Sequence, residues 1–539
     1  MDNGRKQLVE VLAVAAFVAF LFYFGLGAFG LLGADEPRYA QVAREMLARH
    51  DWVTPYLYGQ PWLEKPALYY WRAMFSMEVF GVHDWTARMP SATFATAMIA
   101  IVYYHMRRFR PGAQLDAALM TASCAAVIGF SRAASTDMQL AAPFAIGMLG
   151  WFAWSETDSK VWLFDFYFFI GIGTLAKGPV APGLAVLIVA AYALMHRNWR
   201  MIWRTAWWPG IVLYSAVVLP WYISVQMRNP DFLRVFFLQH NLERFASDLF
   251  HHRQPFWYYL PILGLALLPW TTIVVAAITD AVRHRIWRYP NPRSEDGFPL
   301  FLILWGTIPV VFFSLSQSKL PGYILPAIPP WTILAADYLR REREASESPP
   351  WIFLVAHALI AAMLMGGAML APYIVLRETH IPALPLGVAI ALSVITFLGI
   401  SLTIRRRGLA VLRFVTLVPV IVGVAFLLRV AAPKLDPVLS TRVMAQQLAA
   451  MDTGKSEVAV LGASRNVEYG LAFYRNRIVY RYERGEIPAE GHIVVAPEGS
   501  IDAIREKVPG RRVSFIGNFA PQHLDFYWVF PPGAEHSHK

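Results

Sequence analysis

The chain of 539 residues is poor in charge and in cysteine. Charged side chains make up 16% of it, against about 25% in an ordinary soluble domain, and hydrophobic residues make up 56%. This balance excludes a water-soluble protein built on a single core. The one cysteine, Cys124, lies within an apolar run, so an intrachain disulfide and a thiolate metal cluster are both excluded.

Several motifs of nucleotide-using and metal-using enzymes are also missing. The sequence has no Walker A lysine loop, no HExxH, no Asp-x-Asp pair and no Asn-x-Ser/Thr sequon. Many enzymes that use nucleotide sugars bind a divalent ion and a diphosphate through Asp-x-Asp. Its absence favours a sugar donor without a diphosphate. GLGAFG at 25–30 matches the dinucleotide pattern, but it lies inside an apolar run, where helix packing through small residues is expected and a nucleotide cofactor is not.

The basic residues indicate a membrane topology rather than a nucleic-acid partner. Lys and Arg outnumber Asp and Glu by 48 to 37, which gives a formal net charge of +11. They gather in short clusters between apolar runs, and this is the positive-inside pattern of cytoplasmic loops. The clusters are Arg107, Arg108 and Arg110; Arg197, Arg200 and Arg204; Arg283, Arg285 and Arg288; residues 340–343; and residues 405–407.

Thirteen apolar runs predict as many membrane-spanning helices. With the N-terminus in the cytoplasm, every basic cluster falls on the cytoplasmic side and the C-terminus lies outside. The first run follows Arg5 and Lys6, is too long for a signal-peptide core, and is interpreted as a retained anchor. The runs are 8–32, 88–106, 114–130, 138–154, 161–176, 178–195, 206–226, 257–280, 298–315, 322–339, 351–376, 382–403 and 409–431.

The character of the sequence changes near Pro433. Short apolar stretches such as EVAVLG and HIVVAP then alternate with helix-like segments, a pattern that predicts a small α/β domain over 434–539 on the outer face. The preceding part is expected to form a transmembrane domain, 1–433, whose outer loops are 33–87, 227–256 and 316–321.

Asp35 is the first candidate for chemistry. It lies where the first span ends, just before a predicted helix in which Pro37 takes the first position and Glu36 the cap. An acid at a helix start complements the helix dipole, and that explains Glu36. It does not explain Asp35, because an ionisable group at the mouth of a span marks a functional site by default.

Further cations and acids lie in the other outer loops. A lysine beside the membrane surface is a compact phosphate-binding charge. Several such cations on the side away from the cytoplasmic clusters favour an anionic ligand, most simply a lipid phosphate. The residues are Glu64 and Lys65; Arg132 and Asp137; Lys177; His240, Arg244, His251, His252 and Arg253; and Lys319 and Tyr323.

Four segments together resemble one family of enzymes. ADEPRYA, DWVTPYLYGQPWLEKPALYYW, HHRQPFWYY and SKLPGYILPAIPPW are similar to the bacterial aminoarabinose transferases, which belong to the C-type superfamily of integral membrane glycosyltransferases. The resemblance covers the membrane region, about four fifths of the chain. It implies a C-type fold in the bacterial inner membrane, with the active site and the C-terminal domain facing the periplasm.

The same resemblance implies an activity. A pentosyltransferase of this kind moves 4-amino-4-deoxy-L-arabinose from undecaprenyl phosphate to the phosphates of lipid A. The product carries a positive amine, which lowers the negative charge of the outer membrane and protects against polymyxin and cationic peptides. The implied partners are therefore the lipid-linked donor, the lipid A acceptor and the membrane, with no nucleic acid.

By this analogy Asp35 matches the catalytic acid of the first outer loop, and Asp137 is a second acid in the same cavity. A phosphate acceptor is already ionised near neutral pH, since its second pKa is about 6. Asp35 is therefore expected to orient a substrate or to stabilise positive charge at the anomeric carbon, with removal of a residual proton as the alternative. The residues expected to hold the donor phosphate are Lys65, Arg253, Lys319, Tyr323 and Tyr39.

Two other expectations follow from these residues. Glu64 and His252 resemble a pair that could ligate a divalent metal such as zinc, but two ligands are too few to define a site. Among other functions, a protein O-mannosyltransferase would use the same lipid-phosphate logic with a hydroxyl acceptor. A lipid-linked sugar transporter would show internal repeats, which are absent from the sequence. Thirteen spans are far more than an anchor for a C-terminal binding module needs.

Overall fold

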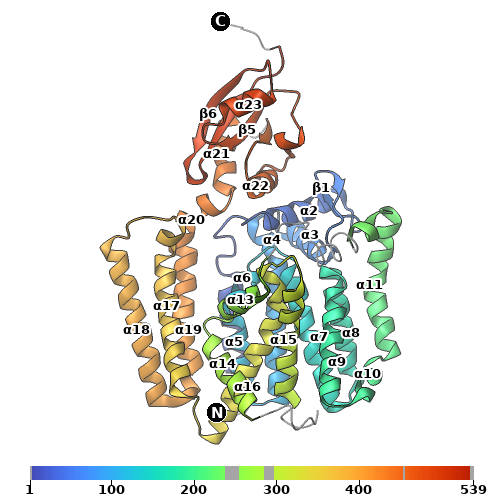
Figure 1. The fold of residues 1–539 in the computed structure, drawn as a ribbon, viewed down its shortest axis with the longest axis vertical. Coiled ribbons are helices and arrows are strands. Elements are labelled where there is room, and N and C mark those ends of the chain that lie inside the picture. The colour runs from blue at the N-terminus through green and yellow to red at the C-terminus, as the bar shows by residue number, and fades with distance from the viewer. Residues whose placement is uncertain (1–2, 237–253, 285–296, 453–455, 534–539) are drawn as a thin grey trace.

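The computed structural model describes residues 3–236, 254–284, 297–452 and 456–533. Figure 1 shows a bundle of roughly parallel helices, with a smaller unit that contains a sheet at one end of it. The first described residues lie at the opposite end of the bundle, and the last described residues lie in the sheet unit. Three short elements, α2, β1 and α3, lie between the bundle and the sheet unit (Figure 1).

The first half of the bundle contains long apolar helices and one early break. The helix that begins the chain ends at Tyr23 rather than near residue 32, and turns follow it. The helices of this half are α1 (Asn3–Val18), η1 (Ala19–Tyr23), α4 (Asp84–Phe109), α5 (Gln114–Ser123), α6 (Ala125–Ser131), α7 (Asp137–Thr157), α8 (Lys160–Lys177), α9 (Val180–Met195), α10 (Trp199–Thr205) and α11 (Trp208–Arg228).

The second half completes the bundle. Figure 1 places α17, α18 and α19 side by side along one flank and α11 on the other. The elements are η3 (Phe256–Tyr258), α13 (Tyr259–Ala266), α14 (Thr271–Arg283), α15 (Gly297–Leu315), η5 (Pro321–Ala327), α16 (Ile328–Ala345), α17 (Trp351–Val375), α18 (Ala383–Arg407), η6 (Gly408–Val411), α19 (Leu412–Phe426), η7 (Leu427–Ala431) and α20 (Ala432–Leu439).

Helices occupy all thirteen of the predicted ranges, but the number of membrane crossings stays a prediction. Among the described residues, five helical segments are long and apolar enough to span a membrane, or up to seven if each of two bent pairs is one span. The pair α5 and α6 is bent by 65°, and the pair η3–α13 and α14 by 113°. The two bends meet, because Ala125 N donates to Leu268 O at 2.9 Å. Backbone groups freed at membrane depth are satisfied in this way.

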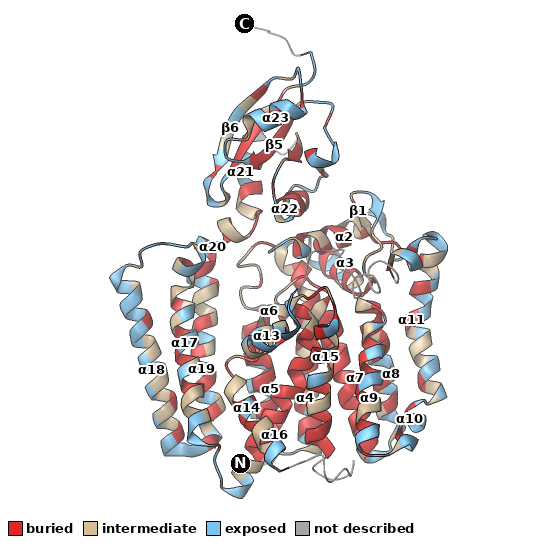
Figure 2. Ribbon diagram, viewed as in Figure 1, coloured by how far each residue is buried: buried red, intermediate tan, exposed pale blue. Residues whose placement is uncertain are grey.

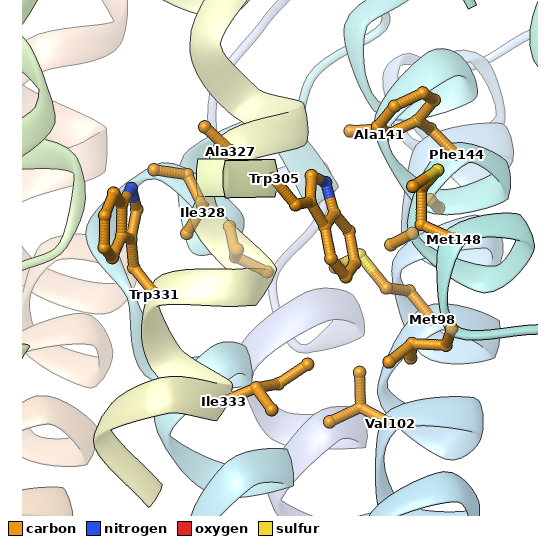
Figure 3. Close-up of a cluster of buried hydrophobic side chains, with 14 of the residues drawn as sticks. Met98, Val102, Ala141, Phe144, Met148, Trp305, Ala327, Ile328, Trp331 and Ile333 are labelled. Atoms are coloured by element: carbon orange, nitrogen blue, oxygen red, sulfur yellow. The ribbon is translucent and has the colours of Figure 1, made fainter. Parts of the chain in front are cut away.

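Large aromatic side chains fill the interior of the bundle. Trp305 of α15 lies between α7 and α16, near Phe144 and Met148, and its indole donates to Pro326 O at 3.0 Å (Figure 3). Gly306 allows the ring of Trp331 to approach, since a Cβ there would lie 2.4 Å from that ring. Buried residues are concentrated in the centre of the bundle, whereas the outer helices are exposed (Figure 2).

The exposed side chains of the outer helices are apolar, which is the reverse of a soluble bundle. Met227 of α11 and Leu384 of α18 are each 79% exposed, and Met363 of α17 is 73% exposed. Apolar surface on this scale has to be covered. Lipid covers it in a multi-pass membrane protein, and the helices and their composition identify the chain as one.

The C-terminal unit is a mixed α/β structure, as the alternating sequence pattern predicts. Its five strands lie in the order β4-β3-β5-β7-β6; β4, β3 and β5 are parallel, whereas β7 is antiparallel to both of its neighbours. Apolar clusters cover both faces of the sheet. The elements are α21 (Arg442–Asp452), β3 (Glu457–Val460), α22 (Arg465–Arg475), β4 (Val479–Arg481), η8 (Tyr482–Arg484), β5 (His492–Pro497), α23 (Ile501–Lys507), β6 (Val513–Phe519), η9 (Ala520–Gln522) and β7 (Leu524–Val529).

Residues 25–30 form a loop, here named the arginine-held loop, between η1 and the layer outside the bundle. Each of its six carbonyl oxygens accepts a hydrogen bond from Arg88 of α4, Arg132 at the end of α6, or Arg442 at the start of α21. The carbonyls of Leu26, Phe29 and Gly30 accept from Arg88, that of Gly25 from Arg132, and those of Gly27 and Ala28 from Arg442, at 2.6 to 2.9 Å.

This loop corrects one expectation. The predicted first span, 8–32, is helical only to Tyr23, because the glycines at 25 and 27 favour turns and the arginines satisfy the carbonyls that a helix would have bonded. Arg132 donates to the carbonyls of Leu21 and Gly25, and its expected contact with an anion stays a prediction. Gly30 has no space for a side chain, since a Cβ would lie 2.4 Å from Ser440 Oγ.

Arg442 should be the strongest tie between the C-terminal unit and the bundle. Besides two loop carbonyls, its guanidinium contacts Asp84 at 2.8 Å and Asp436 at 2.7 Å. We expect Arg442→Ala to destabilise the protein by about 2 to 4 kcal/mol, because two largely buried carboxylates lose their partner. Thermal unfolding of the purified protein in detergent measures this. The matched control is Arg505→Ala, whose exposed pair with Asp502 contributes little; equal melting temperatures for both variants would contradict the assignment.

Candidate active site

The elements outside the bundle bring Asp35 to the end of the arginine-held loop. They are α2 (Asp35–Arg49), the hairpin β1 (Tyr56–Leu57) and β2 (Gln60–Pro61), and α3 (Leu68–Phe80). Asp35 is the first residue of α2, its side chain is 57% exposed, and its carboxylate lies 2.5 Å from the guanidinium of Arg38 one turn later. An exposed carboxylate at the start of a helix and beside a fixed cation is open to a ligand.

Arg38 is held by aromatic rings as well as by Asp35. Its guanidinium lies over Tyr39, Trp62 and Tyr469, at 5.2, 5.1 and 5.6 Å from the ring centroids. Burial lowers the pKa of Arg38, but the charges of Tyr39 and Asp35 raise it above the ordinary value of arginine. The guanidinium therefore stays charged beside Asp35 at every physiological pH.

Glu36 does not cap α2, which corrects the expectation from sequence. The helix begins at Asp35, with Ala34 at the N-cap position. Glu36 is buried, and its carboxylate accepts from Leu32 N at 2.7 Å and pairs with Arg88 at 2.6 Å. The side chain thus turns back under the loop instead of toward its own helix.

The same carboxylate reaches a second segment. Ala134 N donates to Glu36 Oε1 at 2.7 Å, and Ala134 lies three residues before Asp137, the first residue of α7. Glu36 therefore fixes the backbone ahead of both candidate acids. A charged hydrogen bond of this kind contributes about 1.5 to 3 kcal/mol, enough to set the relative position of Asp35 and Asp137.

Asp137 is paired with a lysine from another helix. Lys177, the last residue of α8, places its ammonium 2.5 Å from the Asp137 carboxylate and 5.1 Å from the ring centroid of Tyr323. Both members of the pair are only partly exposed. The ammonium is a compact positive charge with an aromatic face beside it, and it can bind a phosphate.

Gly322 in η5 allows this close approach. A Cβ at residue 322 would lie 2.6 Å from Asp137 Oδ1 and 2.9 Å from the ring of Phe130. Only glycine leaves room for Asp137 at this position. The segment SKLPGY is therefore important for the lack of a side chain at Gly322 as well as for the side chains of Lys319 and Tyr323.

Tyr39 connects the two acids electrostatically. It is buried in α2, and burial raises the pKa of its hydroxyl, with further increases from Asp35, Asp137 and Glu64 that outweigh the opposite effect of Arg38. These three carboxylates are therefore near enough for their charges to act on the Tyr39 hydroxyl. Because its pKa lies above its ordinary value, Tyr39 stays protonated and can donate a hydrogen bond to an anion.

The two lysines expected to bind the donor phosphate, Lys65 and Lys319, differ in burial and in contacts. Lys65 is half-buried in the loop before α3, next to Glu64. Lys319 is 6% exposed, and its ammonium donates to the backbone carbonyls of Gln254 and Ser316 at 3.1 and 2.5 Å. Lys319 thereby holds the two outer segments that flank η3 and η5 together. Its expected contact with a donor phosphate stays a prediction, as does that of Lys65.

Arg253 and His252 lie outside the described residues. The metal pair of Glu64 and His252 therefore stays a prediction. Among the described residues no group of three or more His, Cys, Asp and Glu side chains could hold a metal ion. Of the two residues expected to ligate a metal, only Glu64 lies in the described part of the chain. No step of the reaction proposed below depends on a metal.

Two cavities lie in this part of the structure. One of about 530 Å³ is lined by Glu36, Arg88 and Arg132 together with apolar residues of η7 and α6. The other, of about 500 Å³, is almost wholly apolar and lies between α8, α9 and α11; its lining residue in α8 is Thr174, three residues before Lys177. A cavity with apolar walls can hold the hydrocarbon chain of a lipid.

Sequence reasoning missed the partners of the acids. It named Lys177 only as one of several outer cations, and it assigned Arg38 no role. Arg88 gave no signal, because a single arginine near the start of an apolar span is read as a flanking charge. An ion pair between residues far apart in the chain, such as Lys177 with Asp137, leaves no local pattern.

Paired acids, fixed cations and an apolar cavity at one end of a multi-span bundle are the features of an integral membrane glycosyltransferase that uses a lipid-phosphate sugar. A family model described as dolichyl-phosphate-mannose-protein mannosyltransferase matches residues 7–236. The solved structure of ArnT from Cupriavidus metallidurans bound to undecaprenyl phosphate is similar in fold, with a TM-score of 0.76 and 24% identity over 96% of this chain and 97% of that one.

Two curated relatives show to which family of glycosyltransferases the chain belongs. One is an undecaprenyl phosphate-α-4-amino-4-deoxy-L-arabinose arabinosyl transferase of Edwardsiella ictaluri, 30% identical over 86% of this chain and 85% of its own length. A transferase of the same name from Pseudomonas paraeruginosa is 33% identical over 64% of this chain and 61% of its own. The chain belongs to the family of undecaprenyl phosphate-aminoarabinose arabinosyl transferases.

The space at residue 322 should be essential for activity. We expect Gly322→Ala to lower transfer activity at least about tenfold, because a Cβ would displace Asp137 from Lys177. Activity and thermal unfolding would be measured together. Gly183→Ala in α9 is the matched control, since a Cβ there meets nothing within 4 Å. Full activity of Gly322→Ala would show that Asp137 has no role in that position.

Proposed function

We propose that the chain transfers 4-amino-4-deoxy-L-arabinose from undecaprenyl phosphate to the phosphate groups of lipid A. The arrangement that carries the proposal is the pair of acids at the starts of α2 and α7, each with a cation at 2.5 Å, and both acids raise the pKa of the buried Tyr39. The added amine is positive, so the modified outer membrane binds polymyxin and other cationic peptides less well.

The reaction is a single displacement. An oxygen of the acceptor phosphate attacks the anomeric carbon of the sugar, and the bond from that carbon to the undecaprenyl phosphate oxygen breaks with inversion. The leaving group takes the electron pair and departs as undecaprenyl phosphate. Because the attacking phosphate is already anionic, the step needs no strong base.

The residues divide between the two phosphates. Lys177, three residues after Thr174 of the apolar cavity, neutralises charge on the leaving phosphate, and the hydroxyl of Tyr39 donates to it. Asp35, which is exposed, faces the positive charge that develops at the anomeric carbon. Arg38 guides the acceptor phosphate toward that carbon, since a guanidinium binds phosphate through two parallel hydrogen bonds.

Loss of the Asp35 charge should abolish most of the transfer. We expect Asp35→Asn to lower the rate by about 10² to 10³-fold, because an amide cannot stabilise the developing positive charge. Lys65→Ala should weaken donor binding. The measurement is the mass of lipid A from cells that lack their own aminoarabinose transferase but make the donor.

Asp502→Asn is the matched control for charge loss, since this acid is 85% exposed on α23. Wild type and the control should add the mass of a pentosamine, whereas Asp35→Asn should not. A hexose added to protein instead would favour the mannosyltransferase alternative, which the family model matching residues 7–236 describes. Full modification by Asp35→Asn would remove Asp35 from the mechanism.

The proposed location is the bacterial inner membrane, with the acids and the C-terminal unit in the periplasm. Cys124, the only cysteine, is buried, so Cys124→Ala gives a background for single-cysteine labelling. We expect a membrane-impermeant maleimide to label Asp502→Cys in spheroplasts, and to label Arg406→Cys only after lysis. Both residues are exposed. The opposite result would reverse the orientation.

A further inference from the structure

A third cavity lies outside the bundle, where the hairpin β1–β2 meets the C-terminal unit. Its volume is about 630 Å³, within the range of ligand sites in proteins. Tyr58 and Trp62 line it from the hairpin side, and Tyr469, Tyr480, Ile478 and Arg484 line it from α22 and the edge of the sheet.

The cavity wall also carries charged side chains, Arg484 and Glu486. Beneath the wall, the wholly buried Glu468 holds Arg484 at 3.5 Å and so fixes the direction of that cation.

The cavity is joined to the candidate active site by one side chain. The guanidinium of Arg38 lies over Trp62 and Tyr469, which line the cavity, and its other side pairs with Asp35. A ligand in the cavity would therefore lie directly beside the phosphate that Arg38 guides.

The chemistry of the wall fits a carbohydrate. Aromatic rings with polar edges provide flat apolar faces and a few hydrogen-bonding groups, and a sugar ring has the complementary apolar face and hydroxyl rim. The position of the cavity, outside the bundle, indicates which of the two substrates it could bind. The donor carries one sugar next to its membrane-embedded chain, whereas the glycan of a glycolipid acceptor extends away from the membrane, toward the C-terminal unit seen above α2 in Figure 1.

We propose that this cavity binds the glycan of the acceptor glycolipid and so places its phosphate beside Arg38 and Asp35. The inference rests on the proposed function, and it assigns the hairpin and the C-terminal unit to acceptor recognition. No bond is made or broken in the cavity.

The test fills the cavity without removing a polar group. Ile478 lines it and is 44% exposed, so Ile478→Trp adds bulk at its rim. Ile516→Trp, on β6 of the same unit, is the matched control, since this residue is 38% exposed and does not line the cavity. Tyr480→Ala, which removes a wall residue instead, is the second variant and guards against misfolding of the first.

Each full-length variant would be purified in detergent and assayed with the undecaprenyl-linked donor and two acceptors. One acceptor is lipid A that retains its inner-core sugars, and the other is a diacyl glucosamine 1-phosphate with a single sugar. For Ile478→Trp and Tyr480→Ala, we expect the KM of the larger acceptor to rise about tenfold, with the KM of the small acceptor, the KM of the donor and kcat nearly unchanged.

The outcomes separate the two hypotheses. If wild type modifies neither acceptor, the proposed function fails. If wild type is active and both cavity variants raise the KM of the two acceptors equally, or leave both unchanged, the cavity does not bind the glycan. If Ile516→Trp has the same effect as Ile478→Trp, the change is a general disturbance of the C-terminal unit, and the inference is overturned.

Discussion

The fold around the candidate active site depends on one constraint: the carbonyl oxygens of residues 25–30 must be satisfied after the first helix has ended. Arg88, Arg132 and Arg442 do this from three different elements. Each arginine brings a fixed charge that itself needs a partner, and Glu36 and Asp436 supply two of them. Helix, loop and C-terminal unit are therefore locked by the same few groups, and the position of Asp35 follows from them.

These contacts around the arginine-held loop also explain why two neighbouring acids have different environments. Glu36 is buried and accepts bonds from Leu32 N, Ala134 N and Arg88, so its charge is fully used inside the protein. Asp35 has one cation beside it and more than half of its side chain exposed. Only Asp35 can offer negative charge to a substrate, although the two residues are adjacent in the sequence.

The sequence was a good guide to position and a poor guide to partnership. Apolar length located the helical segments, and the sequence placed Asp35 correctly after the first helix, at the start of the next one. The end of the first helix at Tyr23 was missed, since hydropathy does not report carbonyl partners. The pairs Lys177 with Asp137 and Arg88 with Glu36 join distant helices, so only the packed bundle reveals them.

Paired charges impose an order on anion binding in this site. Lys177 and Arg38 each lie 2.5 Å from a carboxylate, so before substrate arrives their charges are already compensated. In the proposed reaction, a phosphate would gain their attraction by sharing or displacing those carboxylates, and this would release Asp35 toward the sugar. The proposal therefore couples phosphate binding to the availability of the acid through direct contacts, while the aromatic rings around Arg38 hold its guanidinium in position.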